Sequence, residues 1–214
     1  MLRVLPCYGD DSRRDLTMTP KPAPTEVDIH PLLAGRWSPR AYADKPVTRD
    51  IQHQILEAAR WAPSSYNLQP WRFIVFDKHA DAPTYDRAFV TLVPFNQGWS
   101  KPVPVLIAVL AKTTTPKGDT NPCAQYDTGA AAMALVLQAH ALGLCAHQMS
   151  GFDVNAFKQT FQTPDDVLPI AMIAIGHPGD PALLGEALRE REWAPRQRLA
   201  VSELAFAGAW NKPF

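Results

Sequence analysis

The chain has 214 residues, 46% of them hydrophobic, and its 21 Lys and Arg residues balance 21 Asp and Glu residues. This length and composition suit one large domain with a substantial core. A net charge of zero, without a basic tract, excludes the cationic surface typical of a nucleic-acid-binding protein. Three cysteines, Cys7, Cys123 and Cys145, have no metal-ligand spacing and leave an odd thiol, which is typical of a reducing cytoplasm. We therefore expect a cytoplasmic protein without a metal site.

Residues 1–26 combine proline with charge and are predicted to form an extended or disordered arm, which leaves residues 27–214 as one domain. Met18 is a candidate for the natural start of the chain. After the arm, Asp28 has the side chain of a helix N-cap, and Gly35 follows the short helix that it would begin.

Two arginines, Arg36 and Arg40, follow this short helix and flank Trp37 and Ser38. Paired arginines usually belong to a solvated surface. The alternative is a phosphate clamp, because guanidinium groups bind phosphate oxygens through two parallel hydrogen bonds and stay charged. Ser38 would add a hydroxyl donor at short range. These residues alone leave both interpretations open.

A helix is predicted for residues 49–61, with apolar residues at helical spacing and Thr48 as the N-cap. Pro63 ends this helix, and Pro70 precedes an apolar and aromatic run that is typical of a buried strand. Between the prolines lie four polar side chains, Ser64, Ser65, Asn67 and Gln69. A rigid polar connection could bind a planar polar ligand, although a solvated loop explains the same composition.

Further along the chain, residues 77–101 are mixed in composition and are expected to form a loop. Residues 103–111 and 168–176 are apolar and predict two buried strands. Residues 181–192 carry mixed charge and are expected to form a helix or a lid.

The longest predicted helix covers residues 128–144 and is apolar around its whole circumference. A helix of this kind is buried on all sides, which indicates packing against a second copy of the chain as well as its own sheet. A helix internal to one copy is the alternative. An uncharged window, residues 128–152, is long enough to span a membrane, but its Gln and His residues and its alanine content favour a core helix.

The last part of the chain contains two further features. Arg196 and Arg198 alternate along an extended segment and, on their own, read as surface charges. The tail, residues 201–214, is too apolar to remain free in solution and is expected to dock on another surface. His140, His147 and His177 read as satisfied core histidines, since their spacing makes no metal site.

Several short motifs occur together and in one order. They are RWSPR at residues 36–40 with KPV at 45–47, PSSYNLQPW at 63–71, DTGAA at 127–131, the segment 143–153, IGH at 175–177 and RQR at 196–198. This set resembles the nitroreductase family of FMN-dependent oxidoreductases, and the resemblance extends over residues 27–205.

The resemblance implies an α+β fold with three layers, α-β-α. A central mixed, largely antiparallel sheet would be flanked by helices, the long buried helix would lie at a homodimer interface, and the C-terminal segment would be exchanged between subunits. The FMN sites would lie at that interface. The residues assigned to FMN are Arg36, Trp37, Ser38, Arg40, Pro63, Ser64, Ser65, Asn67, Gln69, Met149, Ser150, Gly151, Arg196 and Arg198.

Other implications concern the pocket and the type of flavin. Tyr66 and Trp99 are assigned to the substrate pocket, while Asn96 is either a pocket residue or a turn residue. Ser150 stands where some relatives carry glutamate. No GxGxxG or GxxxxGK[ST] motif occurs, so a phosphate would be held by side chains, which favours FMN over FAD.

The activity that the resemblance implies is reduction of nitroaromatic, quinone or similar electron-poor acceptors. Tightly bound FMN would carry the chemistry by a ping-pong mechanism with NAD(P)H as co-substrate, and no catalytic side chain, metal, nucleic acid or membrane is expected. Two alternatives remain. A flavin enzyme of the same fold could reduce enones, dehalogenate or cleave flavin, or the chain could be a non-catalytic flavin-binding redox regulator.

Overall fold

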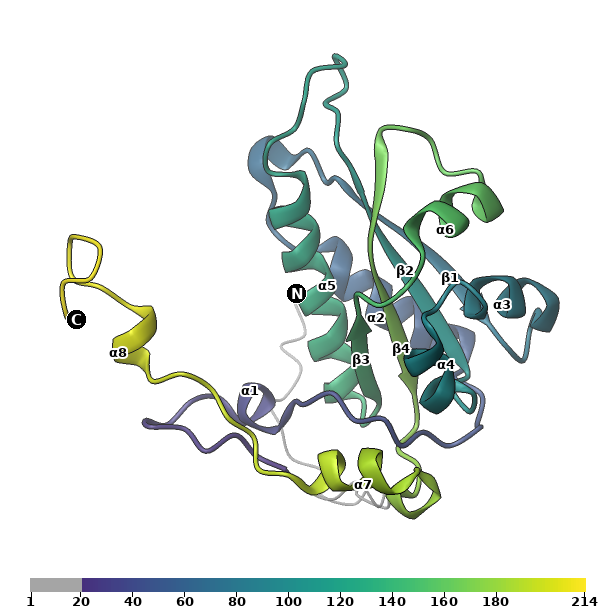
Figure 1. Ribbon diagram of the computed structural model, residues 1–214. Helices are drawn as coiled ribbons and strands as arrows, with labels where there is room; N and C mark the ends of the chain where they lie inside the picture. Colours follow the sequence, from purple (N-terminus) through teal and green to yellow (C-terminus); the bar gives the residue numbers. More distant parts are fainter. Residues whose placement is uncertain (1–20) are drawn as a thin grey trace, which may run out of the picture.

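The computed structural model describes residues 21–214, in which one sheet forms the centre of the molecule (Figure 1). Its strands are β1 (Trp71–Asp77), β2 (Val105–Lys112), β3 (Cys145–Met149) and β4 (Val167–Gly176), in the order β1-β2-β4-β3. Each pair of neighbours is antiparallel. The expected mixed, largely antiparallel sheet is therefore wholly antiparallel within the described residues. The predicted strands 103–111 and 168–176 match β2 and β4 to within two residues at each end.

The helices are α1 (Pro31–Gly35), α2 (Arg49–Arg60), α3 (Ala82–Phe89), α4 (Pro94–Ser100), α5 (Ala124–Ala141), α6 (Val154–Phe161), α7 (Glu186–Trp193) and α8 (Val201–Leu204). Two 3-10 turns, η2 (Ser65–Asn67) and η3 (Pro181–Leu183), complete the elements. Thr48 caps α2 as predicted, since its side chain accepts a hydrogen bond from the amide of Ile51.

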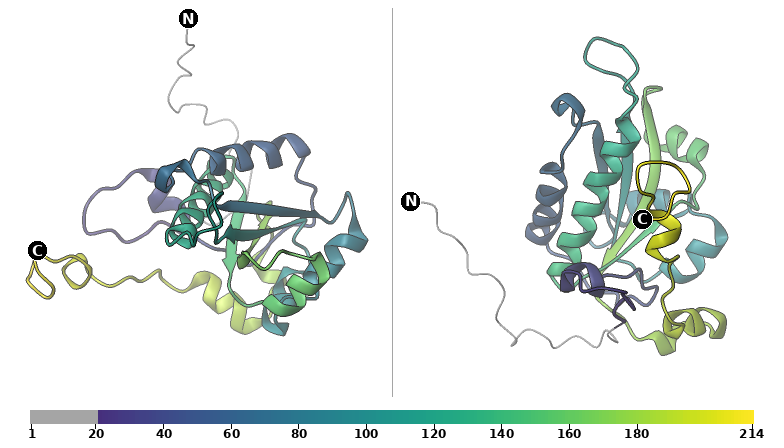
Figure 2. Two further views of the ribbon diagram at one scale, coloured as in Figure 1. Left: turned by 90° about the horizontal axis from the view of Figure 1, so that it is seen from above. Right: turned by 90° about the vertical axis from the view of Figure 1, so that its left-hand side faces the viewer.

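Alternate side chains of β2 build the two faces of the sheet. Val105, Ile107 and Val109 pack with α2 and α5 on one face. Leu106, Ala108 and Leu110 pack with α3, α4 and α6 on the other. Because both faces are covered, every residue of β2 from 105 to 111 is buried. The predicted three-layer α-β-α arrangement is confirmed (Figures 1 and 2).

Helix α5 differs from its prediction in position and in burial. It begins at Ala124 rather than Thr128 and ends at Ala141 rather than Leu144. Thus Asp127, expected at the end of a loop, lies in the first helical turn. One side of α5 is buried, but the side that carries Gly129, Ala130, Met133, Ala134 and Leu137 is partly or fully exposed. A single copy of the chain therefore leaves an apolar stripe of small residues uncovered.

Residues 77–101 are not a loop, as the composition suggested, but contain α3 and α4. Asp81 caps α3 by accepting a hydrogen bond from the amide of Thr84, and each helix has a proline in its first turn. The helices were missed because each spans only about two turns, too short a window within a stretch of mixed composition. Similarly, His30 and not Asp28 caps α1.

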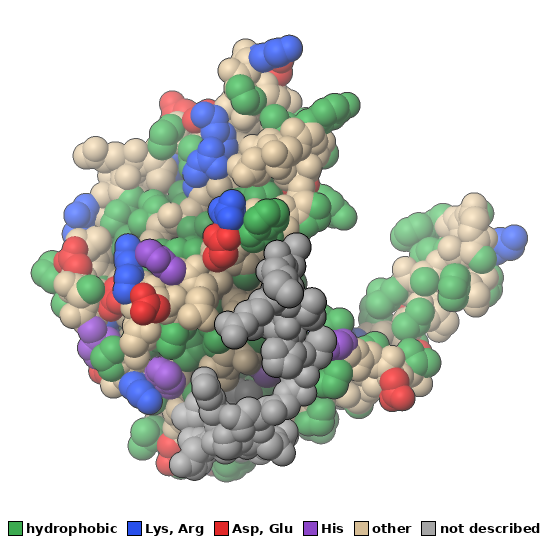
Figure 3. Space-filling model, turned by 180° about the vertical axis from the view of Figure 1, so that it is seen from behind, with side chains coloured by type: hydrophobic (Ala, Val, Ile, Leu, Met, Phe, Trp, Pro, Cys, Tyr) green, Lys and Arg blue, Asp and Glu red, His purple; other side chains and the backbone are tan. Residues whose placement is uncertain are grey.

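The start of the described chain lies against the end of α7, more than 20 residues before the C-terminus. Lys21 Nζ donates to the carbonyl oxygens of Arg191 (3.2 Å) and Glu192 (2.6 Å), which end α7. Residues 21–26 belong to no helix or strand, and the rest of the predicted arm lies outside the described residues. After α7 the chain leaves the body as an extended tail with several exposed apolar side chains (Figures 2 and 3). Within residues 21–214 no helix has both the length and the hydropathy needed to cross a bilayer.

Candidate functional site

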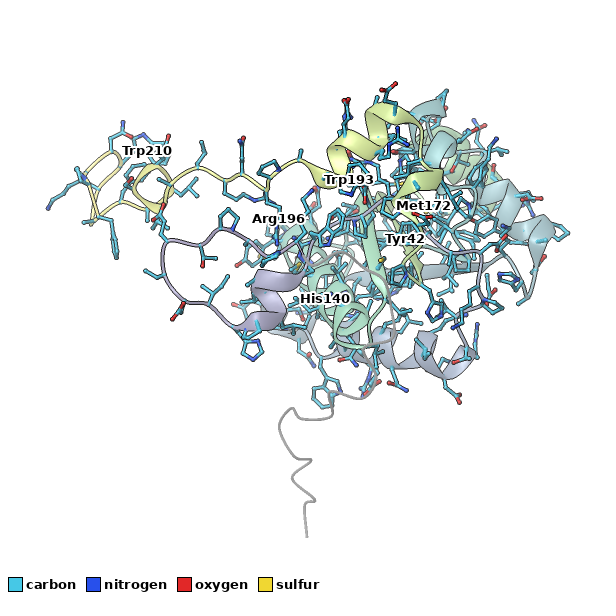
Figure 4. All side chains as sticks on the ribbon, turned by 90° about the horizontal axis from the view of Figure 1, so that it is seen from below. Tyr42, His140, Met172, Trp193, Arg196 and Trp210 are labelled. Atoms are coloured by element: carbon cyan, nitrogen blue, oxygen red, sulfur yellow. The ribbon has the colours of Figure 1, made fainter. Side chains whose placement is uncertain are left out.

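A cluster of positive side chains lies at the C-terminal end of α5. Arg36 Nη1 donates to Ser38 Oγ at 3.4 Å, and Arg196 Nη1 donates to the carbonyl oxygen of Ala34 at 2.6 Å. Burial and the charges of Arg196 and Arg198 lower the pKa of Arg36, and burial together with Arg36 and Arg196 lowers the pKa of His140. His140 and Arg196 lie on the same side of the molecule (Figure 4).

The charge of this cluster is not compensated. Within residues 21–214, Arg36, Arg196 and Arg198 form no ion pair with a carboxylate. Arg36 and Arg196 are partly buried, Arg198 is exposed, and the charges of Arg196 and Arg198 disfavour the charge of Arg36, so a bound anion would stabilise the cluster. These donors, all among the residues that the resemblance assigns to FMN, have the chemistry to bind a phosphate group.

Arg40 occupies a different environment from the other three arginines. Its Nη1 lies 3.8 Å from Glu192 Oε1, and its backbone amide donates to the same oxygen at 2.9 Å. Glu192 is only 3% exposed, and burial raises its pKa against the opposing effect of Arg40. Since the guanidinium of Arg40 already faces a buried carboxylate, it helps to hold α7 on this segment, whereas Arg36 has no carboxylate partner among residues 21–214.

The polar connection between Pro63 and Pro70 has an unusual backbone. Tyr66, Asn67 and Gln69 have φ angles of 50°, 55° and 46°, in the left-handed region that favours glycine. Each non-glycine residue held there costs about 1 kcal/mol or more. Asn67 N donates to Ser64 O and Gln69 N donates to Ser64 Oγ, both at 3.1 Å. The conformation places the Tyr66 side chain outward, where it is 95% exposed.

Asp127 joins this connection to α5. The amide of Ser65 donates to Asp127 Oδ2 at 3.0 Å, and Asp127 is 4% exposed. Sequence reasoning identified Asp127 only as part of the DTGAA motif and gave it no role. A buried acceptor in a first helical turn, four residues after a cysteine that makes no side-chain cap, was a weak signal of this contact.

Met149, Ser150 and Gly151 lie where β3 ends. Met149 is buried, Ser150 is exposed, and the carbonyl oxygen of Gly151 accepts from Val93 N at 3.0 Å and from Asn96 Nδ2 at 2.9 Å. A Cβ atom at Gly151 would lie 2.7 Å from Asn96 Nδ2 and 2.9 Å from Val93 Cγ2. Glycine is therefore required for this close approach to the connection before α4.

The two tryptophans assigned to the site lie deeper than expected. Trp99 is 2% exposed and stacks on Tyr42 with ring centroids 6.0 Å apart, so it belongs to the core and does not line an open surface of this chain. Trp37 is partly buried, with Lys21 Nζ 4.7 Å from its ring centroid.

His147 lies beside Trp99 and is bonded to the backbone. Its Nδ1 lies 2.9 Å from Pro39 O, and its ring centroid is 4.8 Å from that of Trp99. Burial lowers the pKa of His147 to about 4, so the ring is neutral at neutral pH. This confirms the prediction of a satisfied core histidine. Residues 21–214 contain no group of three or more His, Cys, Asp or Glu side chains arranged to hold a metal ion.

Two groups of the assigned residues lie at opposite ends of α5 in one copy of the chain. Ser65 is bonded to Asp127 near the start of α5, whereas Gly35 lies against His140 near its end. Because a helix rises 1.5 Å per residue, these two points are roughly 20 Å apart. The arginine cluster and the connection 63–69 are thus separated by more than the ribityl chain that joins the ring and phosphate of FMN.

Comparison of the sequence and the fold with known proteins identifies the family. The sequence profile of the Nitroreductase family matches residues 33–177. A 15.4 kDa protein of uncharacterised function from Mycolicibacterium smegmatis is 38% identical over 150 residues, which cover 66% of this chain and 99% of that protein. A crystal structure of an oxidoreductase containing FMN is 34% identical, covers 91% of this chain and 100% of its own, and has a TM-score of 0.84.

A second structure, of a nitroreductase from Desulfovibrio desulfuricans in complex with FMN, is 27% identical. It covers 86% of this chain and 99% of its own, with a TM-score of 0.66. The matched profile spans most of the chain and includes the first arginines, the polar connection, α5 and the end of β3. The chain therefore belongs to the nitroreductase family.

Proposed function

We propose that this protein is an FMN-dependent oxidoreductase that accepts hydride from NAD(P)H and reduces nitroaromatic, quinone or similar electron-poor acceptors. Family membership and the FMN-containing relative of 34% identity support this proposal. The observation that carries it is the uncompensated cluster of Arg36, Arg196 and Arg198 at one end of α5, with the polar connection 63–69 at the other. One end has the chemistry for a phosphate and the other for a polar heteroaromatic ring.

Because the two ends are too far apart to hold one FMN, we propose a homodimer in which each site uses both copies. The uncovered stripe of α5, with Gly129, Ala130, Met133 and Ala134, allows close approach of a second α5. An antiparallel, two-fold pairing would bring the arginine cluster of one copy to the polar connection of the other. The exposed tail would then cover part of the second copy.

In this arrangement the chain supplies binding and orientation. When bound, the flavin supplies the hydride and electron transfer. Arg36, Arg196 and Arg198 would hold the phosphate, while Ser64, Ser65, Asn67 and Gln69 of the other copy would hydrogen-bond to the polar edge of the ring. The exposed Tyr66 would form a wall of the pocket into which NAD(P)H and the acceptor enter in turn. His147 is neutral and bonded to Pro39, so it is not poised as an acid.

The experiment that tests the proposal is anaerobic mixing of the purified protein with NADPH or NADH. Bleaching of the visible flavin band within seconds, followed by its return on addition of a nitroaromatic or a quinone, is the expected result. An enone and a halogenated phenol in the same panel test the related activities of the fold. A flavin band that neither cofactor bleaches would contradict a reductase and favour a redox regulator.

A further inference from the structure

The connection Ser65–Gln69 needs an anchor, because its backbone is held in a conformation that its own residues do not favour. Three of its five residues are non-glycine residues with positive φ angles. Its internal hydrogen bonds join residues at most five apart in sequence, such as Gln69 N to Ser64 Oγ. Bonds of this range keep the turn closed but do not fix it relative to the rest of the molecule.

Among the described residues, the bond from Ser65 N to Asp127 Oδ2 is the hydrogen bond that ties Ser65–Gln69 to a distant element, since the two residues are 62 apart in sequence. The amide of Ser65 opens the 3-10 turn η2, and Ser64 provides no side-chain cap for that turn. Asp127 therefore supplies, from α5, the acceptor that a local cap residue supplies elsewhere.

The position of Asp127 suits this task. Its carboxylate lies in the first turn of α5, where the helix dipole stabilises a negative charge. No Lys or Arg of residues 21–214 forms an ion pair with it. A carboxylate that is 4% exposed is costly unless its oxygens accept hydrogen bonds, so the Ser65 amide and Asp127 stabilise each other.

We propose that Asp127 is a positioning residue that holds Ser65–Gln69 in its left-handed form and so presents Tyr66 and the polar groups of this connection to the flavin site of a second copy. The proposal rests on the proposed function for its final step. In this proposal Asp127 supports the part of the site that binds the flavin ring, whereas the arginine cluster binds the phosphate. The two ends can therefore be distinguished by ligands with and without a phosphate.

The test compares Asp127→Ala and Asp127→Asn with a matched control, Thr128→Val, in the full chain. Thr128 is the next residue of α5, is fully buried, and its Oγ1 has no hydrogen-bond partner in the described structure. Two quantities are measured: hydrogen exchange of the amides in Ser65–Gln69, and the affinities of the apoprotein for FMN and for riboflavin.

For Asp127→Ala we expect exchange of Ser65–Gln69 to accelerate by about 10- to 150-fold, the range expected from loss of one hydrogen bond to a charged group. The affinities for FMN and riboflavin should fall by a similar factor for both ligands. Asp127→Asn retains an oxygen acceptor and should recover most of this loss. Thr128→Val should change neither quantity.

Unchanged exchange in Asp127→Ala would overturn the proposal, and so would faster exchange with flavin affinities equal to those of Thr128→Val. If Asp127→Ala does not fold, Asp127→Asn decides the outcome through the same two measurements. In that variant we expect exchange of Ser65–Gln69 to be faster, and both flavin affinities to be lower, by a smaller factor than in Asp127→Ala. A wild-type protein that binds neither flavin would refute the proposed function, and the exchange measurement would still show whether Asp127 holds the connection.

Discussion

The side-chain amide of Asn96 donates a hydrogen bond of 2.9 Å to the carbonyl oxygen of Gly151. Asn96 is 8% exposed, and its Oδ1 accepts from Trp99 Nε1 at 3.3 Å. Helix α4 therefore fixes the segment that follows β3, and Asn96 is neither a turn residue nor an open pocket residue. A buried amide that satisfies one backbone carbonyl and one indole makes this segment rigid where the resemblance assigns Met149, Ser150 and Gly151 to FMN.

The identity of the cofactor can be predicted from the donor set. The arginine cluster suits one terminal phosphate, and no glycine-rich phosphate loop accompanies it. We expect the protein to purify with FMN and not FAD. Mass spectrometry of the flavin released by heat measures this directly, and a predominance of FAD would contradict the assignment of these arginines.

Replacement of Arg36 by Ala should weaken FMN binding by about 1.5–3 kcal/mol, the range for hydrogen bonds to charged groups. Riboflavin, which lacks the phosphate, should bind almost as well as it does to the wild type. Titration of the apoprotein with each ligand measures both values. Arg87→Ala is the control, because Arg87 lies on α3 and donates to the carbonyl oxygen of Thr160. Equal losses for the two ligands would mean that Arg36 acts on the fold.

Removal of residues 201–214 should abolish both the dimer and flavin binding. The tail carries Trp210 and Phe214, which are 83% and 85% exposed, and the apolar stripe of α5 is also uncovered in one copy. Surfaces of this kind are typical of an obligate dimer whose interface exceeds the standard of about 1,600 Å².

Sedimentation of the full and shortened chains measures the assembly, and the melting temperature of the full chain should rise with protein concentration. A shortened chain that is monomeric, soluble and loaded with flavin would show that the tail and the stripe have another role.

His147 predicts a pH dependence of stability whose sign follows from its pKa. Burial lowers the pKa from 6.5 to about 4, so the unfolded state binds this proton more readily than the folded state. The free energy of unfolding should therefore fall as pH decreases from about 6.5 to about 4, and level off below that range, by on the order of 3 kcal/mol at most.

The variant His147→Gln isolates this effect from that of the carboxylates. Chemical denaturation of wild type and variant between pH 4 and 7.5 gives the difference in unfolding free energy at each pH. A difference that does not change with pH would contradict the assignment of the slope to His147.

Gly179 is predicted to tolerate no side chain. Its amide donates to Ala41 O at 3.0 Å, and a Cβ atom would meet the backbone carbonyl of Tyr42 and lie 2.8 Å from the amide nitrogen of Ala43. Gly179→Ala should destabilise the fold by about 1–3 kcal/mol, the usual cost of overpacking. Gly185→Ala is the matched control, since a Cβ atom there meets no neighbour within 4 Å. Equal melting temperatures for the two variants would contradict the prediction.

Local sequence pattern was sufficient to predict several secondary-structure elements of this protein. The apolar runs predicted β2 and β4, and the spacing of apolar residues with Thr48 predicted α2, because hydrophobic periodicity and capping depend on residues near in sequence. The order of the motifs predicted the family and the three-layer fold. It also assigned Arg36, Ser38, Arg196 and Arg198 to one site, although they are far apart in sequence.

The tertiary structure alone decided which of these residues act together. Arg40 faces Glu192 across 152 residues of chain, and Ser65 bonds to Asp127 across 62, so no local pattern could pair them. The burial of Trp99 likewise depends on how α4 packs against Tyr42. Sequence determined the types of group available, since propensity and patterning are local. Folding determined their partners and their separation along α5, because burial and hydrogen bonding depend on which distant residues are brought together.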